Sequence, residues 1–528
     1  MKYKVFLTEV VQFPFHIKHS ISLICIGLLV VGLTVSTPAK DETQQINSDD
    51  TRQLIKQAGK LTRKGEMAEA EKMLRRALKI DPQESKAKLA LAFVLFKQRR
   101  LIEAYDLSYE VAKNEPKNSY AFAVLGATLL SAGNFPNAKI AFINALQMDR
   151  REALAWAGLG TLDFYENRIF EGLENLREAV YHAPDEPDYL FTLAQVSARA
   201  EKYKEAADAY EKFLQISQQT DAERRDRIRG LINFLKFLGI KQSLYNLGGG
   251  DETTVPFELI NNRPIIKIRI NGKDEPLNFV LDTGSGISVI SKETAKRLKI
   301  KSISKGGLAR AIGGDGKFEI VYGFLKNVVI GDVKIKNVPI YIREFHSKGD
   351  QLDGYIGLSL ISKFLTTVDY GNSTFALKKK NLNKTRENAG ELLSLPLRLT
   401  SSGFLSGEVQ LEGIQAPMNF IVDTGASVSV ISDEVAGLKE ISRFIREEKM
   451  RVVGAAGITE DVPSFLLPRV TFGTHSRESI MAIALDLDLI NEASGFEQAG
   501  ILGGNFLKNY SLTFDFTNSK VIFVPISK

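Results

Sequence analysis

The feature that most constrains this chain is a block of sequence that occurs twice. Phe279 to Ser291 is FVLDTGSGISVIS, and Phe420 to Ser432, 141 residues further on, is FIVDTGASVSVIS. A repeat of this length predicts a duplicated domain, and each copy places one aspartate, Asp282 or Asp423, at the end of an apolar run. Two such carboxylates brought together would make an acid–base pair, so the duplication carries our hypothesis for the function.

The two copies share further landmarks on both sides of this block. Upstream, three residues recur at the same spacing: Gly272 and Gly413, Pro276 and Pro417, Asn278 and Asn419. Downstream, DGYIGLSLISKFLTTVDYGNS from Asp353 to Ser373 matches AGILGGNFLKNYSLTFDFTNS from Ala499 to Ser519. Glycine within an apolar strand indicates that another backbone segment passes close by, so we expect tight backbone packing in this second segment.

Composition excludes several classes of protein. A chain of 528 residues is too long for one core, so about two to four domains are expected. The net charge of +6 is small, which argues against a dedicated nucleic-acid binder. Cys25 is the single cysteine, and the five histidines are scattered without ligand spacing. We therefore expect no disulfide, no metal and no cofactor in the part that follows.

The N-terminus predicts export. Lys2, Lys4 and Lys18 precede an apolar run from Ile21 to Ser36, and polar sequence follows from residue 41. The basic flank predicts that the N-terminus stays in the cytoplasm, with the later residues on the periplasmic or extracellular side. Residues 1–40 are interpreted as a signal peptide or a membrane anchor, and the twenty residues before the run favour an anchor.

The region 51–246 is predicted to be helical and repetitive. It is rich in Ala, Leu, Lys and Glu with helical periodicity. WxxLG at 156–160 repeats FxxLG at 122–126, a period of 34 residues. At related spacings the chain has small residues, which let paired helices approach closely, and prolines, which end them. These are Ala70, Ala104, Ala138, Gly172 and Ala206, and Pro82, Pro116 and Pro184.

This pattern resembles the tetratricopeptide repeat (TPR) over residues 51 to 216, about five repeats. The segment from Asp221 to Ile240 is interpreted as a closing helix, and Leu247 to Gly250 as a flexible joint. The resemblance implies a concave surface that binds a peptide or partner protein. A helical solenoid that acts only as a spacer is the alternative.

After Thr254 the pattern changes to short alternating strands. Two β lobes are expected, at 255–380 and 394–528, with a polar linker between them. In the first lobe, Ile265 to Ile270 and Leu277 to Leu281 are predicted to form a hairpin through an Asn-Gly turn that feeds the first Asp-Thr-Gly.

Asp-Thr-Gly-Ser/Ala behind an apolar pair, followed downstream by an apolar-apolar-Gly motif, resembles the aspartic protease superfamily. The resemblance spans residues 255 to 528 and implies two all-β lobes of the aspartic-protease type. Together with the TPR-like repeats, the expected fold is an α-solenoid followed by these two lobes. The tandem arrangement is similar to pepsin, and the short lobes are similar to the retropepsin-like enzymes, which dimerise.

The resemblance assigns roles to residues of both copies. Asp282 and Asp423 would be the catalytic pair, sharing one proton and activating a water, because two close carboxylates cannot both be ionised cheaply. The supporting loops would be Thr283, Gly284 and Ser285, and Thr424, Gly425 and Ala426. The threonines would hydrogen-bond across the axis, and the glycines would let amides approach the carboxylates. Ser285 could bond to Asp282, whereas Ala426 cannot bond to Asp423.

Each copy also has a glycine-rich hairpin of the kind that the family uses as a flap over the substrate. The flap glycines are Gly313, Gly314 and Gly316 in one copy and Gly454 and Gly457 in the other. Neither turn has the tyrosine typical of pepsin flaps, since Tyr322 lies beyond the hairpin. Asp369 and Asp515 precede turn sequences and are predicted to be structural.

Two functional hypotheses follow. The first is an aspartic endopeptidase whose lobes form one site within the chain, with symmetric pairing between two molecules as a variant. The second is an inactive peptide clamp or scaffold built from the same lobes. The expected partners are a protein or peptide substrate, a protein on the TPR-like surface and the membrane if the N-terminal segment is uncleaved, with no nucleic acid.

Overall fold

The computed structural model describes residues 42–218, 221–241, 243–314, 316–346, 351–380 and 394–526. The apolar run at 21–36, interpreted as a signal peptide or anchor, lies outside these residues. Within the described ranges, no helix combines the length and the apolar character needed to cross a bilayer. The chain divides into two compact parts, the first ending at Leu125 and the second beginning at Gly126.

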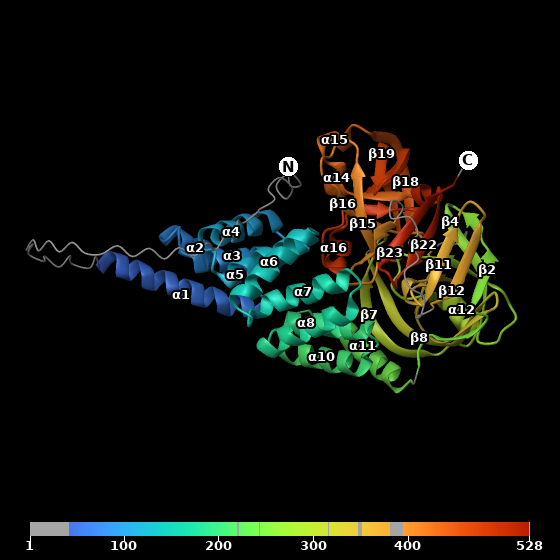
Figure 1. The fold of residues 1–528 in the computed structure, drawn as a ribbon, viewed down its shortest axis with the longest axis horizontal. Coiled ribbons are helices and arrows are strands. Elements are labelled where there is room, and N and C mark those ends of the chain that lie inside the picture. The colour runs from blue at the N-terminus through green and yellow to red at the C-terminus, as the bar shows by residue number, and fades with distance from the viewer. Residues whose placement is uncertain are drawn as a thin grey trace, which may run out of the picture. The chain divides into compact units, whose positions relative to one another are not determined.

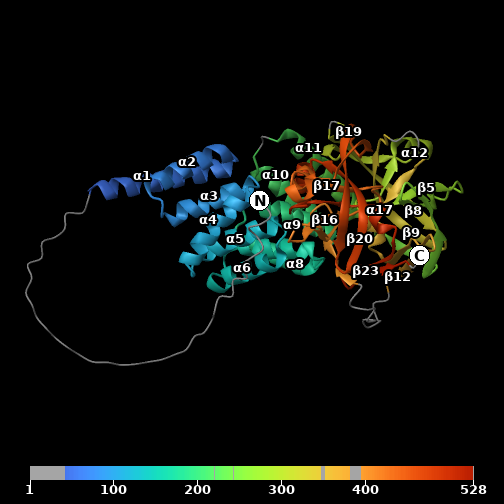
Figure 2. The same cartoon turned by 90° about the horizontal axis from the view of Figure 1, so that it is seen from above.

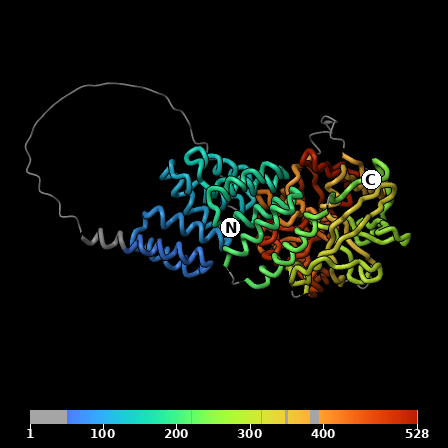
Figure 3. The backbone as a smooth tube through the Cα atoms, turned by 90° about the horizontal axis from the view of Figure 1, so that it is seen from below, coloured from blue at the N-terminus to red at the C-terminus, as the bar shows by residue number. Residues whose placement is uncertain are grey.

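The described residues up to Ile240 are helical, as the period of 34 predicts (Figure 1). The helices are α1 (Glu42–Lys64), α2 (Met67–Ile80), α3 (Ser85–Lys97), α4 (Leu101–Asn114), α5 (Ser119–Ser131), α6 (Phe135–Met148), α7 (Ala153–Tyr165), α8 (Ile169–His182), α9 (Pro187–Arg199), α10 (Tyr203–Ile216) and α11 (Ala222–Ile240). Their successive coils are visible in the tube of Figure 3.

The repeated residues explain this regularity. Ala70, Ala104, Ala138 and Ala206 are completely buried between paired helices. At the fifth such position, a Cβ on Gly172 would lie 2.8 Å from the carbonyl oxygen of Gly160, so only glycine allows this helix approach. The three repeated prolines each lie two residues beyond a helix end, where proline commonly follows a helix.

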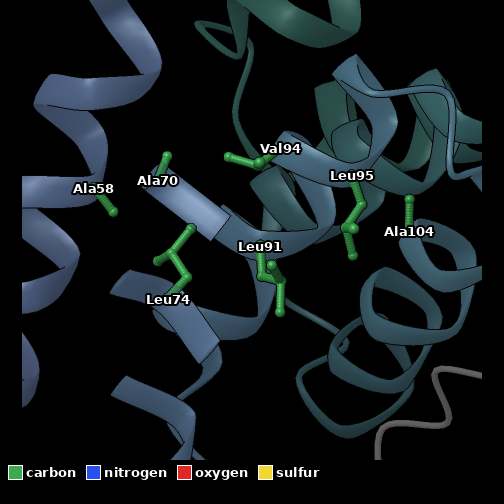
Figure 4. Packing of buried hydrophobic residues seen from close by; sticks show 7 residues of the cluster. All are labelled: Ala58, Ala70, Leu74, Leu91, Val94, Leu95 and Ala104. Atoms are coloured by element: carbon green, nitrogen blue, oxygen red, sulfur yellow. The ribbon is translucent and has the colours of Figure 1, made fainter. Parts of the chain in front are cut away.

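In the first compact part, a core forms between α1, α2, α3 and α4. It contains small and branched side chains that interlock at close range, and Figure 4 shows them: Ala58, Ala70, Leu74, Leu91, Val94, Leu95 and Ala104. All seven are buried. This part of the repeat is therefore held by apolar packing, as expected for helices whose inner faces carry alanine and leucine.

The first lobe, with its short helices, follows α11. Its elements are β1 (Asn246–Gly249), β2 (Glu252–Pro256), β3 (Glu258–Ile260), β4 (Arg263–Ile270), β5 (Leu277–Leu281), β6 (Val289–Ser291), α12 (Lys292–Arg297), β7 (Ser302–Arg310), β8 (Lys317–Ile330), β9 (Val333–Arg343), β10 (Gly354–Ile356), α13 (Leu358–Ile361), β11 (Phe364–Asp369) and β12 (Thr374–Lys379).

The second lobe repeats this order. Its elements are β13 (Ser394–Pro396), β14 (Arg398–Leu399), β15 (Leu405–Leu411), β16 (Met418–Val422), β17 (Ser429–Ser432), α14 (Asp433–Ala436), α15 (Lys439–Ser442), β18 (Ile445–Val453), β19 (Ile458–Phe472), β20 (His475–Leu485), α16 (Asp488–Ser494), β21 (Gly500–Leu502), α17 (Gly504–Leu507), β22 (Tyr510–Asp515) and β23 (Lys520–Pro525).

Three sheets organise the lobes. One sheet belongs to the first lobe, with β5 and β10 at its centre, and an equivalent sheet in the second lobe contains β16, β17 and β20 (Figure 2). A third sheet, in the order β13-β23-β22-β11-β12-β2, takes strands from both lobes. At its middle β11 pairs with β22, and the hydroxyls of Thr367 and Thr513 bond at 2.9 Å. The lobes are thus joined by continuous backbone hydrogen bonding.

The interpretation of Leu247 to Gly250 as a flexible joint is wrong. Residues 246–249 form β1, which pairs with β9 so that Gly249 lies opposite Val333. A Cβ on Gly249 would lie 2.2 Å from the carbonyl oxygen of Asp332. The glycines therefore allow β1 and β9 to approach each other closely. The first lobe begins directly after the last helix.

The Asn-Gly hairpin in the first lobe is present. Asn271 and Gly272 both have positive φ, 51° and 72°, as a tight turn of this type requires. Four further residues lie between this turn and β5, so the connection is longer than a two-residue loop.

The closing helix α11 packs on the first lobe along β7 and β8 (Figure 1). Near its middle, Gly230 accepts a hydrogen bond from Ser304 Oγ at 2.7 Å, and a Cβ there would lie 2.0 Å from the carbonyl oxygen of Lys305. Further along, the ring of Phe234 stacks on Tyr322 at 4.6 Å. The last helix of a solenoid normally presents a polar outer face to water, whereas the outer face of α11 is buried against a sheet.

Candidate active site

Each aspartate is placed by a pair of parallel strands. In the first lobe β5 runs parallel to β10, and Asp282 N–H donates to the carbonyl of Ile356 at 3.0 Å. In the second lobe β16 runs parallel to β21, and Asp423 N–H donates to Leu502 at the same distance. The Asp-Thr-Gly motif and the downstream glycine motif of each copy therefore lie side by side. The main chain of each aspartate is hydrogen-bonded to the strand of the downstream motif in the same lobe.

Glycine makes this approach possible. A Cβ on Gly354 would lie 2.2 Å from the ring of Phe279 and 2.4 Å from the carbonyl oxygen of Val289. The equivalent distances at Gly500 are 2.3 Å to both Phe420 and Val430. The expectation that backbone passes close to these glycines is confirmed.

The two Asp-Thr-Gly loops are tied together by their threonines. Thr283 Oγ1 donates to the carbonyl of Val422 and Thr424 Oγ1 donates to that of Leu281, both at 2.7 Å. Each hydroxyl also accepts from the main-chain N–H of the opposite threonine, at 3.0 and 3.2 Å. Both threonines are buried, so these four bonds hold the lobes in one register without competition from water.

Within this frame the carboxyl groups of Asp282 and Asp423 hydrogen-bond to each other. Space around them is so limited that a Cβ on Gly284 would lie 2.4 Å from Asp423 Cγ, and one on Gly425 would lie 2.8 Å from Asp282 Cγ. Both aspartates lie deep in the protein, yet each retains some solvent-accessible surface. The pair is therefore formed within one chain and remains reachable from solvent.

Burial raises the pKa of both carboxyls, because removal from water disfavours the charged form. The neighbouring Asp423 raises the pKa of Asp282 further, to well above its usual range, although Arg343 opposes this. At Asp423 the rise is restrained by the N–H of Gly425, which donates to Oδ1 at 2.7 Å. The pKa of both carboxyls is therefore raised, and the stronger causes of the rise act on Asp282.

The expected bond from Ser285 to Asp282 is not formed. Ser285 Oγ donates instead to the carbonyl of Ile287 at 2.8 Å, which closes a local turn. Oδ1 of Asp282 is buried and has no hydrogen-bond partner. Ala426 packs against the apolar cluster of its own lobe.

Glycine-rich hairpins rise from both lobes, and their tips touch. The first is β7 and β8, and the second is β18 and β19. Ala456 N–H donates to the carbonyl of Ile312 at 3.0 Å, and Gly313 lies against Gly457 and Gly454. The expected flap glycines 313, 314, 316 and 457 have positive φ, so the turns need glycine there, whereas Gly454 is required by its contact with Ile312.

Each hairpin tip also contacts the opposite lobe. Ile312 packs on the second-lobe cluster that includes Leu485, and the same cluster contacts Ala426 beside Asp423. In the other direction, Arg343 at the end of β9 donates to the carbonyl of Ala455 at 3.1 Å. The hairpin tips are thereby placed near the aspartate loops.

Arg343 is a site residue that the sequence analysis missed. Strand register pairs Ser291 with Arg343 in the first lobe and Ser432 with Leu485 in the second, so Arg343 and Leu485 are equivalent. No motif marks it, but an alignment of the two copies that continued to β9 and β20 would have placed a charged residue in one copy at the position of an apolar residue in the other.

Asp369 and Asp515 have the predicted structural role. Asp369 Oδ1 accepts from the N–H groups of Gly371 and Asn372, and Asp515 repeats this with Thr517 and Asn518. Both aspartates close hairpins of the shared sheet.

In the part of the chain that the structure describes, no three His, Cys, Asp or Glu side chains gather in a way that could hold a metal ion.

Comparison with family models assigns the parts of the chain. Residues 266–360 match the aspartyl protease family, and residues 408–509 match the gag-polyprotein aspartyl protease family. Residues 61–84 and 159–220 match tetratricopeptide repeats. The chain thus consists of a TPR domain followed by two tandem domains of the aspartic protease superfamily.

Solved structures show more distant likenesses. A TPR protein from Thermus thermophilus is 20% identical, with a TM-score of 0.31, over 34% of this chain and 98% of that one. An aspartic proteinase from Irpex lacteus is 14% identical, with a TM-score of 0.37, over 52% of this chain and 98% of that one. No curated protein matches the sequence.

Proposed function

We propose that this protein is an aspartic endopeptidase that hydrolyses peptide bonds between Asp282 and Asp423. The observation that carries the proposal is the hydrogen-bonded carboxyl pair, held by the cross-axis threonine bonds and still accessible to solvent. The aspartyl-protease family matches to both lobes support it.

The two carboxyls divide the chemistry between them. Asp423, the ionised member, takes a proton from a water as the water oxygen attacks the peptide carbonyl carbon. Asp282, the protonated member, donates a hydrogen bond to the carbonyl oxygen and stabilises the charge that develops there. The C–N bond then breaks as the nitrogen receives the proton from Asp423. The N–H of Gly425 keeps Asp423 oriented throughout.

The experiment that tests the proposal compares the full-length protein with its Asp423→Asn variant on a diverse peptide library. We expect the wild type to cleave and the variant to lose about a thousandfold in rate or more, because the general base is gone. A wild type that binds peptides but cleaves none would contradict the proposal and favour the peptide clamp. Circular dichroism checks that the variant is folded.

We further propose that the TPR domain binds a protein. Its helix α8 exposes Phe170 and Tyr181, which are 68% and 78% accessible. Exposed aromatic side chains of this kind are typical of protein contacts. Alanine at both positions should slow cleavage of a protein substrate that docks there but leave short peptides unaffected. A spacer predicts no change with either substrate.

The site is proposed to act on the periplasmic or extracellular side of the cytoplasmic membrane. The proposal rests on the lysines that precede the apolar run at 21–36. Proteolysis of intact and permeabilised cells tests it, since only an exported domain is digested when the membrane is closed.

A further inference from the structure

We propose that Arg343 is a specificity-determining residue that selects peptides with an acidic side chain on the first-lobe side of the site. This inference rests on the proposed peptidase function. The Arg343 guanidinium is close enough to Asp282 to act on its titration, and it bonds to the tip of the opposite hairpin at Ala455. It therefore lies where a bound peptide would pass between the aspartates and the hairpins.

Within the described part of the chain, the charge of Arg343 has no anionic partner. No carboxylate of the described residues forms an ion pair with it, and the side-chain hydrogen bond that it donates goes to the neutral carbonyl of Ala455. In the proposed mechanism the nearby Asp282 carries the shared proton. The guanidinium is largely buried, which lowers its pKa, but none of its nitrogens is a buried atom without a partner, so the nitrogens not bonded to Ala455 keep some contact with solvent. A guanidinium in this state binds carboxylates well.

Aromatic rings hold the guanidinium in position. It lies 5.0 Å from the ring centre of Phe345, 5.5 Å from that of Tyr355 and 5.8 Å from that of Phe318. Phe345 and Tyr355 also pack edge to face. Cation–π contacts of this kind fix the planar group without neutralising it. Little ordering is then needed when a carboxylate binds.

The second lobe has no equivalent charge. Leu485 occupies the position of Arg343, since they pair with the equivalent residues Ser432 and Ser291. Ile501 occupies the position of Tyr355, since they pair with the equivalent residues Ile421 and Val280. Leu485 and Ile501 belong to the apolar cluster that Ile312 covers. The two walls of the site therefore differ in chemistry, and one peptide direction fits better than its reverse.

The test uses peptides blocked at both ends, so that a side chain is the only carboxylate. A single Glu, Gln or Lys is moved through an otherwise apolar sequence, and kcat/KM is measured at each position. We expect wild type to prefer Glu over Lys about tenfold or more at one position or a few adjacent ones. Arg343→Leu should reduce this ratio to near one, and Arg343→Glu should invert it.

Two controls separate specificity from structure. Lys334→Glu makes the same change in charge at the exposed far end of β9, and we expect it to keep the wild-type preference. If Arg343 only tethers the hairpin tip at Ala455, Arg343→Leu will lower kcat/KM equally for Glu, Gln and Lys peptides, which overturns the inference. An unblocked peptide with neutral side chains shows whether the terminal carboxylate is bound instead, an outcome that also overturns it.

Failure of the proposed function gives a different result. Binding of the same peptides to the Asp423→Asn variant, measured by fluorescence anisotropy, does not require catalysis. A Glu preference in binding together with absent cleavage by wild type would overturn the peptidase and keep the charge selection. Equal binding of Glu and Lys peptides would overturn the role of Arg343, whether or not wild type cleaves them.

Discussion

Thr283 and Thr424 exchange hydrogen bonds across the boundary between the lobes, each accepting from the main-chain N–H of the other at 3.0 and 3.2 Å. Each hydroxyl also donates to the carbonyl that precedes the opposite aspartate. Because both side chains are buried, the position of the two carboxyls depends on these bonds directly.

Thr283→Val should therefore lower both stability and activity. The substitution keeps the shape of the side chain but leaves the N–H of Thr424 and the carbonyl of Val422 buried without partners. We expect a loss of roughly 2–6 kcal/mol in the free energy of unfolding, at about 1–3 kcal/mol for each of the two unpaired groups. Chemical denaturation measures the loss, and peptide hydrolysis measures the misplacement of the dyad.

Thr367→Val is the matched control. It removes one side of the hydroxyl pair with Thr513 in the shared sheet, which is half-buried. We expect it to cost about 1 kcal/mol or less and to leave hydrolysis unchanged. Equal effects of the two substitutions would show that the threonine bonds in the Asp-Thr-Gly loops have no special part in the site.

The pH–rate profile of hydrolysis should be bell-shaped, with both limbs at higher pH than the ordinary pKa of an aspartate would give. Activity requires one proton on the pair, so it is lost at low pH when Asp423 is protonated and at high pH when Asp282 is deprotonated. Burial raises the pKa of both groups above the ordinary 3.8, so both limbs of kcat/KM should lie above that pH. A maximum below pH 3.8 would contradict the asymmetric, buried pair.

Arg343→Leu should move the high-pH limb of this profile upward. The positive charge of Arg343 lowers the pKa of Asp282, so its removal allows the proton to be retained to higher pH. The low-pH limb should change less, because Arg343 is not among the main influences on Asp423. A profile that shifts as a whole, or not at all, would argue against this electrostatic contact.

Asp282→Asn should stabilise the protein at neutral pH. An acid whose pKa is raised on folding favours the folded state below its unfolded pKa, near 3.8, and this contribution is lost as pH rises towards the folded value. Asparagine does not titrate, so the variant should gain about 1.4 kcal/mol for each unit of pKa difference, and the gain should vanish below pH 3.8. Thermal unfolding across pH measures it, with the exposed Asp274→Asn as control.

Gly230→Ala should weaken the attachment of α11 to the first lobe. Alanine favours helices, but its Cβ would lie 2.0 Å from the carbonyl oxygen of Lys305, so the overpacking should cost about 1–3 kcal/mol. Gly239→Ala lies in the same helix with no atom nearer than 3.8 Å, and it should be neutral or stabilising by up to about 1 kcal/mol. If both variants gain stability, the close contact with β7 is absent in solution.

Much of the fold could be predicted from the sequence because its signals are local or repeated. The buried alanines, the prolines after helix ends and the paired Asp-Thr-Gly segments each carry a short-range physical requirement. The positive-φ residues that join paired helices also recur every 34 residues, at Gly65, Arg99, Gly133, Asn167 and Glu201. Arg99 and Glu201 give no sign of this in their own chemistry, since the repeat imposes the turn.

What could not be predicted depends on contacts between distant segments. The burial of α11 on β7 and the pairing of β1 with β9 join pieces that have no common motif. The repeated segments that contain β11 and β22 do not indicate that these two strands pair with each other. The glycines of β1 indicated flexibility because glycine has two uses, freedom and close approach, and only the partner strand decides between them. The bond of Ser285 to Ile287 was missed for the same reason, since two acceptors lay within reach.

The joining of both halves of the site in one polypeptide has a consequence for how this protein can change. In an assembly of two identical subunits, every substitution appears on both sides at once, so the walls stay alike. Here residues 343 and 485 are encoded separately, so one can be arginine while the other is leucine. Substitutions can therefore change how one end of a bound molecule is recognised and leave the recognition of the other end unchanged.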